Sequence, residues 1–355
     1  MKTTFLNITF TFFSFSLLFS QTILSADGPG NTYEDITSVL APGYNAVEVP
    51  DCSHTDFGRH IDEVFDTELD TNVFRFIAHQ TPDNDRCQNF DRQRVEIKTY
   101  ASSPDHLKAT EGETVAYTWK FKLPNDFQVS SSFTHIHQIK AVGGPYESIP
   151  MITLTLRKSS PDRIELRYTA TNNQNTIETA NLDLLRGHWV QVTETITFGN
   201  EGSYSIDINQ VSNGASILSY SNDTMDTWQD GANFARPKWG IYRSLNQIND
   251  LQDEIVRFAD FSIEEFGPLT VEDLETKAEA ITLVPNPAKH TVTFKNAKAD
   301  DYDAIILYNS SGETIPTDNQ LKRYRLDVSD LSTGLYYIAF IKSKRTVKVL
   351  KCLVK

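Results

Sequence analysis

Apolar and polar residues alternate along most of the chain between Tyr33 and Phe266. In the clearest run every second residue is apolar: Val115, Tyr117, Trp119, Phe121 and Leu123. The same period of two recurs in residues 164–168, 190–198, 204–208 and 256–263, separated by polar turns such as residues 199–202. Because successive side chains of a strand point to opposite faces, this pattern predicts strands with one buried face. We therefore predict an all-β fold, a β-jelly-roll (concanavalin-like sandwich), with a short helix within residues 55–70.

The two ends of the chain depart from this pattern. Met1-Lys2 followed by an apolar run from Phe5 to Ser20 predicts a secretory signal peptide over residues 1–26, cleaved between Ser20 and Ala26. No later segment is long and apolar enough to predict a membrane span. The jelly-roll domain is expected over residues 27–266, an acidic linker over 267–280, and a second, small β-sandwich domain over 281–355.

The last segment contains V-P-N-P-A-K-H-T-V-T-F at residues 284–294 and L-S-T-G-L-Y at residues 331–336. In this order the motifs closely resemble the C-terminal sorting domain of type IX secretion. The resemblance implies the type IX secretion machinery as a partner and an extracellular or cell-surface location. The alternative is an ordinary immunoglobulin-like module.

Charge and cysteine content narrow the function classes. The formal net charge of −14 over 355 residues argues against a nucleic-acid partner, which would need a broad basic surface. An acidic polysaccharide is still compatible, because a locally basic groove can lie on an acidic body. Nothing in the pattern indicates an oligomer, and we expect a monomer.

In an exported protein, Cys52 and Cys87 are expected to form a disulfide, although two unrelated buried thiols are the alternative. Closing this loop would stabilise the fold by about 4 kcal/mol in the chain-entropy model. No C-x-x-C or H-E-x-x-H spacing occurs, so we expect no zinc and no required cofactor. Asp83, Asn84 and Asp85 form a short oxygen-rich stretch that could hold a structural calcium ion, but a simple turn is the favoured interpretation.

Three segments carry polar residues that a plain sandwich would not need. In the first, K-W-G-I-Y-R-S, alternation places Lys238, Gly240, Tyr242 and Ser244 on one face, with Arg243 between them. A cation, a phenol and a hydroxyl on one face suit an anionic sugar and a proton transfer. The alternative is an ordinary strand with one surface tyrosine.

In the second segment Arg94, Glu96 and Lys98 alternate with Val95 and Ile97. One face of this strand would be charged and the other buried, although a cross-strand ladder of ion pairs is an alternative interpretation. His79 precedes this segment as a further substrate-binding candidate, or as a residue that caps a loop.

The third segment, T-H-I-H-Q-I-K, leaves two registers open. If Ile139 points inward, Gln138 and Lys140 face the groove and His137 faces away, unless a bulge intervenes. If the register slips by one residue, His135 and His137 face the groove instead. The remaining histidines, at positions 54, 60, 106, 188 and 290, show no local partner and are interpreted as structural or surface residues.

All three segments resemble motifs of the jelly-roll polysaccharide lyases, in the family order. R-V-E-I-K at 94–98 resembles their R-x-E-x-R strand, H-Q-I-K at 137–140 their Q-I-H strand, and K-W-G-I-Y-R-S at 238–244 their K-A-G-x-Y-x-Q strand. With His79 and D-R-Q-R-V-E-I-K, the pattern looks most like the ulvan lyases of polysaccharide lyase family twenty-eight and their glucuronan-lyase relatives. Lys140 stands where alginate lyases have His, and Ser244 where they have Gln, which argues against alginate.

The resemblance implies β-elimination next to a uronate in an anionic, ulvan-like, sulfated algal polysaccharide. Arg94, Gln138 and a histidine would neutralise the uronate carboxylate, and Tyr242 with His137 or His135 would move the protons. A free phenol titrates at about pH 10, so forming phenolate at neutral pH costs about 4 kcal/mol unless nearby cations lower the cost. Lys238, Arg243, Arg94 or Lys140 would supply those cations. Lys98, Lys140 and Arg243 would also meet sulfate or carboxylate groups on neighbouring sugars.

Other functions are compatible with the same pattern. A non-catalytic carbohydrate-binding jelly roll, a lyase acting on glucuronan or alginate, and a surface adhesin all fit a secreted β-sandwich. A laminarinase-type hydrolase is disfavoured because the chain has no E-x-D-x-x-E motif.

Overall fold

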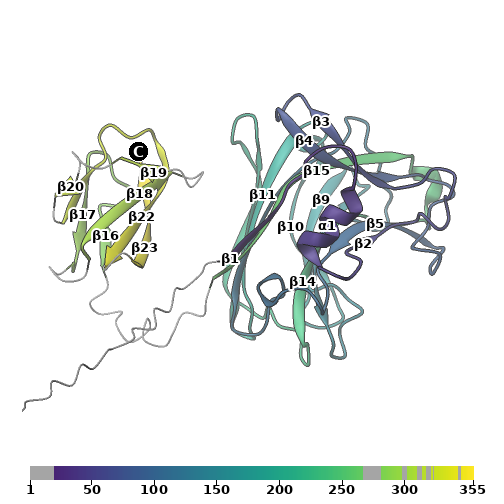
Figure 1. Ribbon diagram of the computed structural model, residues 1–355, viewed down its shortest axis with the longest axis horizontal. Coiled ribbons are helices and arrows are strands. Elements are labelled where there is room, and N and C mark those ends of the chain that lie inside the picture. Colours follow the sequence, from purple (N-terminus) through teal and green to yellow (C-terminus); the bar gives the residue numbers. More distant parts are fainter. Residues whose placement is uncertain are drawn as a thin grey trace, which may run out of the picture. The chain divides into compact units, whose positions relative to one another are not determined.

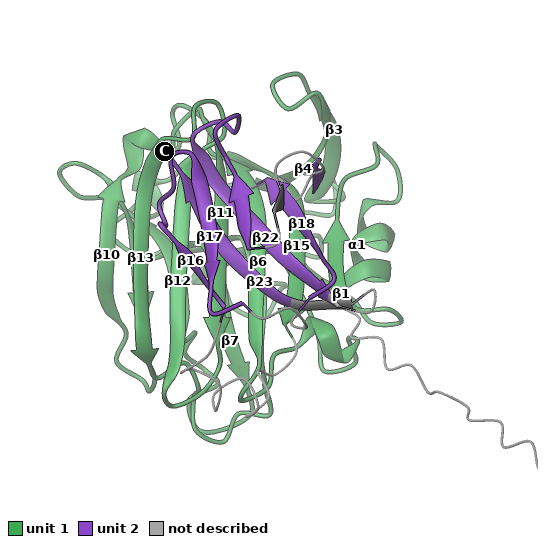
Figure 2. Ribbon diagram, turned by 90° about the vertical axis from the view of Figure 1, so that its left-hand side faces the viewer, with its two compact units in different colours: residues 1–268 green, residues 269–355 purple. Residues whose placement is uncertain are grey.

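The computed structural model describes residues 20–266, 281–297, 302–309, 314–316, 321–322, 324–342 and 345–355. The chain divides into two compact units, residues 1–268 and 269–355 (Figures 1 and 2). The predicted linker 267–280 lies outside the described residues.

The first unit is a sandwich of two antiparallel sheets (Figure 1). One sheet has the order β13-β12-β11-β6-β15-β4-β3, and β1 pairs with β15. Its strands are β1 (Ser20–Leu24), β3 (Ile61–Asp66), β4 (Thr71–Ala78), β6 (Thr114–Lys122), β11 (Trp189–Thr197), β12 (Gly202–Gln210), β13 (Ser216–Met225) and β15 (Glu254–Phe266).

The second sheet has the order β10-β9-β8-β7-β14-β5-β2. Its strands are β2 (Val47–Glu48), β5 (Arg92–Lys98), β7 (Thr134–Val142), β8 (Ile152–Arg157), β9 (Arg163–Tyr168), β10 (Asn175–Asn181) and β14 (Phe234–Ser244). Three short 3-10 helices connect strands: η1 (Asp105–Leu107), η2 (Leu182–Leu184) and η3 (Ile248–Asp250).

The hydrophobic core between the sheets comes from the alternation seen in the sequence. On β6, Tyr117, Trp119 and Phe121 are buried, whereas the lysines between and after them, Lys120 and Lys122, are partly exposed. Burying an aromatic side chain of this size contributes roughly 1.5–3 kcal/mol. The predicted all-β jelly-roll sandwich is confirmed.

The helix expected within residues 55–70 is wrong, because that region forms the edge strand β3. Two of its buried positions, Glu63 and Asp66, are polar and lie on opposite faces of the strand, so the apolar alternation of a strand is lost. Glu63 accepts the Gly28 N–H (2.7 Å), and Asp66 accepts from Trp189 Nε1 (3.2 Å). Hydrogen bonds thus take the place of apolar contacts along this strand.

The one α-helix among the described residues, α1 (Thr32–Leu40), was not expected from the sequence. It is nine residues long and contacts β1, β2 and β3 (Figure 1). Ile36 and Leu40 enter the core. Two buried apolar residues in so short a segment give a weak helical pattern.

The predicted signal peptide lies mainly on residues 1–19, which are outside the described residues. Its last part overlaps β1, which pairs with β15 from Ser20↔Glu265 to Leu24↔Phe261. Within the described residues, no helix has the length and apolarity required to span a bilayer.

The predicted disulfide is confirmed: Cys52 and Cys87 are bonded, with their Cα atoms 6.3 Å apart. It joins the loop after β2 to the loop between β4 and β5. Cys352 is a free, buried cysteine in the second unit.

The second unit contains two four-stranded sheets, in the orders β16-β17-β21-β20 and β19-β18-β22-β23. Their strands are β16 (Thr282–Val284), β17 (Thr291–Lys295), β18 (Ala304–Asn309), β19 (Thr314–Ile315), β20 (Leu321–Lys322), β21 (Arg325–Asp327), β22 (Gly334–Lys342) and β23 (Arg345–Val354). A separate core, including Val292, Leu307, Leu326 and Ile338, holds the two sheets together.

Candidate active site

A groove of about 690 Å³ lies on the face of the seven-stranded sheet that points away from the sandwich core. This volume is in the usual range for a ligand site. The residues that line it are Arg92, Arg94, Phe133, His135, Gln138, Lys140, Ser148, Ile149, Pro150, Arg157, Arg167, Asn172, Asn173, Gln174, Asn175, Lys238 and Tyr242. Six of the predicted site residues are among them: Arg94, His135, Gln138, Lys140, Lys238 and Tyr242.

Strands β5 and β14 build part of the floor of the groove in regular register. Lys238 is opposite Lys98, Tyr242 opposite Arg94, and Ser244 opposite Arg92. The predicted common face of Lys238, Gly240, Tyr242 and Ser244 follows from this unbroken pairing with β5. Gly240 has φ +141°, and a Cβ there would lie 2.1 Å from the Val95 carbonyl oxygen. Only glycine fits this position.

The third strand, β7, resolves the register that the sequence left open. Between His135 and His137, β7 advances two residues while β8 advances one and β14 advances three. Ile136 enters the core at this irregularity. As a result His135 returns to the groove face together with Gln138 and Lys140, and His137 points into the core.

The expectation that His137 faces the groove is therefore not met. Its side chain is fully buried, with Nδ1 3.0 Å from the Lys238 carbonyl oxygen and Nε2 2.8 Å from Glu194. The ring also packs on Trp119, with 4.3 Å between centroids. His137 is a core histidine with both ring nitrogens bonded.

Charged groups form a dense network beneath the groove. Glu48 on β2 binds Lys98 (2.5 Å), Lys238 (2.6 Å) and Arg86 (2.6 Å). Glu96 binds Lys238 at 2.7 Å and also accepts hydrogen bonds from Arg94 and Gln138. Burial alone would raise the pKa of Glu48, but the surrounding cations, led by Lys238, hold that pKa far below its ordinary value.

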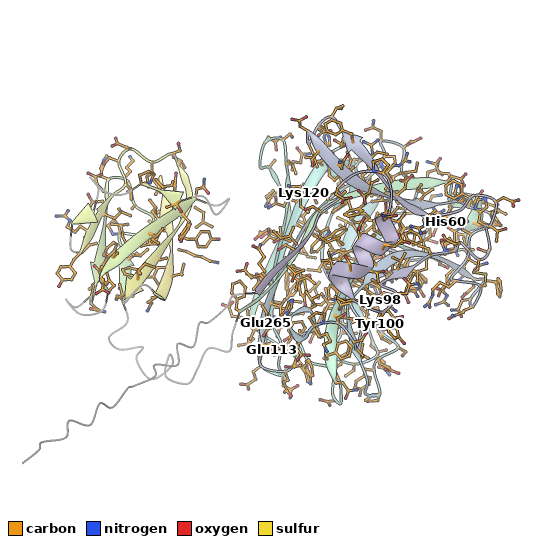
Figure 3. The ribbon with its side chains drawn as sticks, in the orientation of Figure 1. His60, Lys98, Tyr100, Glu113, Lys120 and Glu265 are labelled. Atoms are coloured by element: carbon orange, nitrogen blue, oxygen red, sulfur yellow. A yellow bond between two sulfur atoms is a disulfide. The ribbon has the colours of Figure 1, made fainter. Side chains whose placement is uncertain are left out.

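Arg94 and Lys98 differ in their access to the groove. Arg94 Nε donates to Asp85 (2.8 Å), and its guanidinium still lines the groove. Lys98 is buried, and its Nζ lies 4.2 Å from the centre of the Tyr100 ring (Figure 3). Glu96 and Lys98 thus support the groove from below, in the ion-pair ladder that was the alternative interpretation of this strand.

The Tyr242 phenol lies among cations and rings. Its oxygen accepts a hydrogen bond from Arg92 Nη1 at 3.0 Å, and Arg94 lies 3.8 Å from its ring centroid. The His135 ring is 5.9 Å away, and Phe133 stacks on His135 at 4.9 Å. A hydroxyl and an imidazole are therefore close enough to act on opposite ends of one sugar ring.

Burial lowers the pKa of two groove residues, His135 and Lys140. Burial lowers the pKa of His135 to about 3, and its Nδ1 has no hydrogen-bond partner within the described part of the chain. Burial, with the nearby charges of Lys238 and Arg94, lowers the pKa of Lys140 to about 8. Within the part of the chain that the structure describes, Lys140 makes no ion pair.

Sequence reasoning missed one wall of the groove. Arg157 and Arg167 share the buried Glu165 carboxylate with Arg163, at 3.4, 2.9 and 2.7 Å. Three guanidinium groups around one carboxylate leave this wall positively charged. Arg92 was also missed, although it is on the same face of β5 as Arg94 and alternation could have found it.

Three other predicted substrate-binding residues lie outside the groove lining. Arg243 is fully buried on the core side of β14, where its Nε donates to Gln93 at 2.6 Å, and burial lowers its pKa to about 10. Ser244 is buried and its hydroxyl accepts the Asn246 N–H at 3.2 Å. His79 lies in a separate cluster of histidines.

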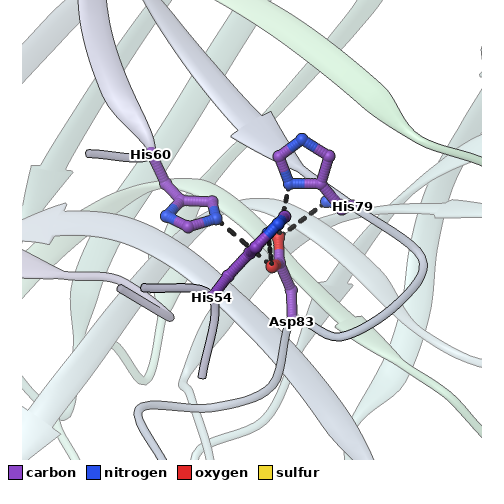
Figure 4. A group of neighbouring side chains, drawn as sticks. All are labelled: His54, His60, His79 and Asp83. Atoms are coloured by element: carbon purple, nitrogen blue, oxygen red, sulfur yellow. Dashed lines mark hydrogen bonds and ion pairs between the residues drawn. The ribbon is translucent and has the colours of Figure 1, made fainter. Parts of the chain in front are cut away.

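That cluster consists of His54, His60 and His79 around the buried Asp83 carboxylate (Figure 4). His54 and His60, which show no local partner in the sequence, contact Asp83 more than twenty residues away. The carboxylates of the oxygen-rich stretch 83–85 also bind side chains of the protein: Asp83 contacts the histidines, and Asp85 binds Arg94 and Arg86.

Comparison with known families agrees with this geometry. Residues 59–260 match the polysaccharide lyase family, and residues 282–355 match the secretion system C-terminal sorting domain. The chain belongs to the polysaccharide lyase family, and its tail is a sorting domain of the type IX secretion system, which indicates secretion and surface attachment. No curated protein sequence gives a significant match.

Polysaccharide-degrading lyases are among the solved structures with a similar fold. An endo-β-1,4-glucuronan lyase from the fungus Trichoderma reesei is 17% identical, with 57% of this chain and 86% of that chain covered and a TM-score of 0.40. A marine alginate lyase from Aplysia kurodai is 12% identical, with 68% and 97% covered and a TM-score of 0.45.

Proposed function

We propose that this protein cleaves a sulfated, uronate-containing algal polysaccharide of the ulvan type by β-elimination. In this proposal the signal peptide exports the chain, and the sorting domain then takes it across the outer membrane. The observation that carries the proposal is the groove itself, in which Tyr242 and His135 lie together under a set of cations.

The charge of the groove favours an anionic polymer. None of the described residues that line it is acidic, although the whole chain has a net charge of −14. Lys140 has no carboxylate partner among the described residues, and Arg157 and Arg167 share one carboxylate with a third arginine. A sugar with only one carboxylate per uronate would leave some of these cations unpaired, whereas added sulfate groups would satisfy them.

The first requirement of elimination is to acidify the proton on C5 of the uronate. A cation must bind the adjacent carboxylate so that the negative charge that develops there is stabilised. Lys140 fits this role because it is a cation without a bound carboxylate. Arg94 is already bonded to Asp85 and Glu96, so we assign it to positioning Tyr242 through the ring contact at 3.8 Å.

The second requirement is a base and an acid. The base takes the C5 proton, the C–H electron pair forms the C4–C5 double bond, and the bond from C4 to O4 breaks as O4 receives a proton. We assign Tyr242 as one of these groups, because Arg92 already donates to its oxygen and would stabilise the charge that forms during transfer. His135 is the partner, since its unbonded Nδ1 requires a group from the substrate.

The test is to incubate the purified protein with ulvan, glucuronan, alginate and heparin, and to follow ultraviolet absorbance from unsaturated uronate ends together with reducing ends. We expect new absorbance with ulvan. Tyr242→Phe should lower kcat by roughly 10²–10⁴-fold, the usual contribution of a positioned acid or base. The matched control is Tyr44→Phe, at a tyrosine that is 55% exposed and outside the groove lining, and it should keep full activity.

The outcomes separate the alternatives. Absorbance with glucuronan or alginate but not with ulvan would keep the lyase and refute the substrate. Reducing ends without absorbance would show hydrolysis, and binding without cleavage would show a carbohydrate-binding module. Equal activity of the two tyrosine variants would remove Tyr242 from the mechanism.

A further inference from the structure

We propose that His54, His60, His79 and Asp83 form a binding site for one zinc ion, separate from the groove. The four side chains come from three places in the chain: the loop after β2, the residue just before β3 and the loop between β4 and β5. One ligand atom from each lies within 4.8 Å of all the others. Figure 4 shows the three rings arranged around the carboxylate.

The three nitrogen-to-oxygen distances are close to the ligand spacing of a tetrahedral zinc ion. His54 Nδ1 is 3.0 Å from Asp83 Oδ1, His60 Nε2 is 3.2 Å from the same oxygen, and His79 Nδ1 is 3.2 Å from Oδ2. Zinc binds nitrogen and oxygen ligands at about 2.0–2.1 Å, so neighbouring ligands of a tetrahedral ion are roughly 3.3 Å apart. An ion could therefore enter with small movements of the side chains.

The surroundings hold the ligands as a metal site needs. His60 Nδ1 lies 2.7 Å from Asp51 Oδ1, which directs the other ring nitrogen, Nε2, toward the cluster. A carboxylate behind a metal-binding histidine fixes the ring and makes it a better ligand. Tyr33 in turn donates to Asp51 at 3.0 Å. Asp83 is fixed by the His79 backbone N–H at 2.7 Å.

The site is also enclosed. The side chains of His60 and Asp83 are fully buried, and those of His54 and His79 are 22% and 16% exposed. Phe57 packs against all three rings, with centroid distances of 5.2, 4.9 and 4.3 Å to His54, His60 and His79. A closed set of four ligands is typical of structural rather than catalytic zinc.

The ligand types select the metal. Three imidazoles and one carboxylate suit zinc, whereas calcium and magnesium prefer six or more oxygen ligands or several retained waters. The alternative without metal is that Asp83 accepts hydrogen bonds from all three rings. In that case the ring nitrogens would be bonded to protons and zinc would have no affinity beyond that of a surface histidine.

The position of the cluster indicates what zinc would do. It would tie the loop after β2 to the loop between β4 and β5, next to the Cys52–Cys87 disulfide that joins the same loops. The second loop also carries Asp85, which binds Arg94 in the groove. Zinc would thus stabilise the fold around one end of the groove, without contact to the substrate.

The experiment uses the full chain, stripped with a chelator and titrated with zinc chloride. We expect one zinc per chain by mass spectrometry, and visible absorption of tetrahedral cobalt when Co²⁺ replaces zinc. Free zinc at a hundredfold excess over Kd should raise Tm by roughly 5–10 °C. Calcium at the same concentration should leave Tm unchanged.

The variants are His54→Gln and, as a matched control, His188→Gln at an exposed histidine outside the cluster. His54 is partly exposed, so its replacement should leave the chain folded and lower zinc affinity at least tenfold. His188→Gln should bind zinc as the parent does. The proposal is overturned if the stripped parent binds no zinc, gives an octahedral cobalt spectrum, responds to calcium instead, or is matched in zinc affinity by His54→Gln. Lyase activity is not the readout, so this result is independent of the proposed function.

Discussion

Replacing Glu48 by Gln tests whether the network under the groove is held by charge. Glu48 is on the two-residue edge strand β2, and its side chain is 5% exposed. Its carboxylate contacts Lys98, Lys238 and Arg86 at 2.5–2.6 Å and Arg94 at 3.5 Å. Glutamine keeps the shape and one acceptor oxygen but removes the charge.

The expected loss is large because the cations would stay buried. Breaking a buried ion pair by removing one partner costs about 3–5 kcal/mol, since a charge is left without compensation. For a domain of this size each kcal/mol lowers Tm by roughly 2–4 °C, so Tm should fall by about 6–20 °C. The remaining amide oxygen places the result toward the lower end of that range.

The stability lost in Glu48→Gln should depend on pH, because the pKa of Glu48 is lowered in the folded state. A carboxylate whose pKa is lower in the folded state stabilises the fold above its unfolded pKa of about 4.3, and this contribution is lost as the pH falls further. The difference between parent and Glu48→Gln should therefore be greatest at pH 6–8 and shrink in acid. Thermal and urea unfolding at several pH values measure it.

The matched control is Glu34→Gln. Glu34 also binds an arginine at 2.6 Å, but its side chain is 57% exposed and that of its partner Arg59 is 46% exposed. Exposed pairs contribute little, so no measurable change is expected. If both variants lose the same stability, or if Glu48→Gln loses less than about 1 kcal/mol at pH 7, burial is not what makes the network important.

Two further predictions concern the groove. Gly240→Ala should lower the free energy of unfolding in urea by about 2–4 kcal/mol, because the new Cβ would lie 2.1 Å from the Val95 carbonyl oxygen in a backbone with φ +141°. The control is Gly43→Ala, where φ is +80° and no atom lies within 4 Å, so only the backbone strain of about 1 kcal/mol is expected. Equal losses in the two variants would contradict the steric argument. The pKa of Lys140 is lowered to about 8, so this side chain loses its positive charge as the pH rises through 8, and kcat/KM should fall over the same range. Lys140→Arg should keep activity at pH 9, and an unchanged alkaline limb in this variant would exclude Lys140 as its cause.

The fold could be predicted from the sequence wherever one strand face is apolar. The run around Trp119 contains strictly alternating burial, and its prediction is confirmed. The pattern failed at β3, where Glu63 and Asp66 occupy buried positions and accept hydrogen bonds from residues distant in the sequence. A local pattern contains no information on such partners.

The site could be predicted only in part for the same reason. Alternation put Lys238 and Tyr242 on one face, and the structure places both in the groove. Strand order was needed to bring in Arg157 and Arg167, which come from strands not recognised as part of the groove. His54 and His79 come from two loops that the Cys52–Cys87 disulfide joins, and His60 lies between them in the sequence. The spacing of these histidines along the chain matches no metal-binding motif.

The positions of His135 and His137 show how backbone irregularity creates the site. In an unbroken strand, residues two apart share a face, so both imidazoles would lie in the groove or both in the core. The extra residue Ile136 separates them, so that His135 lines the groove and His137 lies in the core. His135 Nδ1 has no hydrogen-bond partner among the described residues, whereas His137 joins Glu194 of the opposite sheet to the carbonyl of Lys238.

That second contact matters to the groove although His137 never reaches it. Lys238 is two residues before Gly240, the point where β14 passes so close to β5 that no side chain fits. A hydrogen bond from the core at Lys238 therefore fixes β14 next to the position where its path is most constrained. Tyr242 follows two residues later on the same face, so the core histidine sets the place of the phenol from behind the sheet. In the proposed mechanism only His135 therefore acts on the substrate, and His137 holds β14 in position from the core.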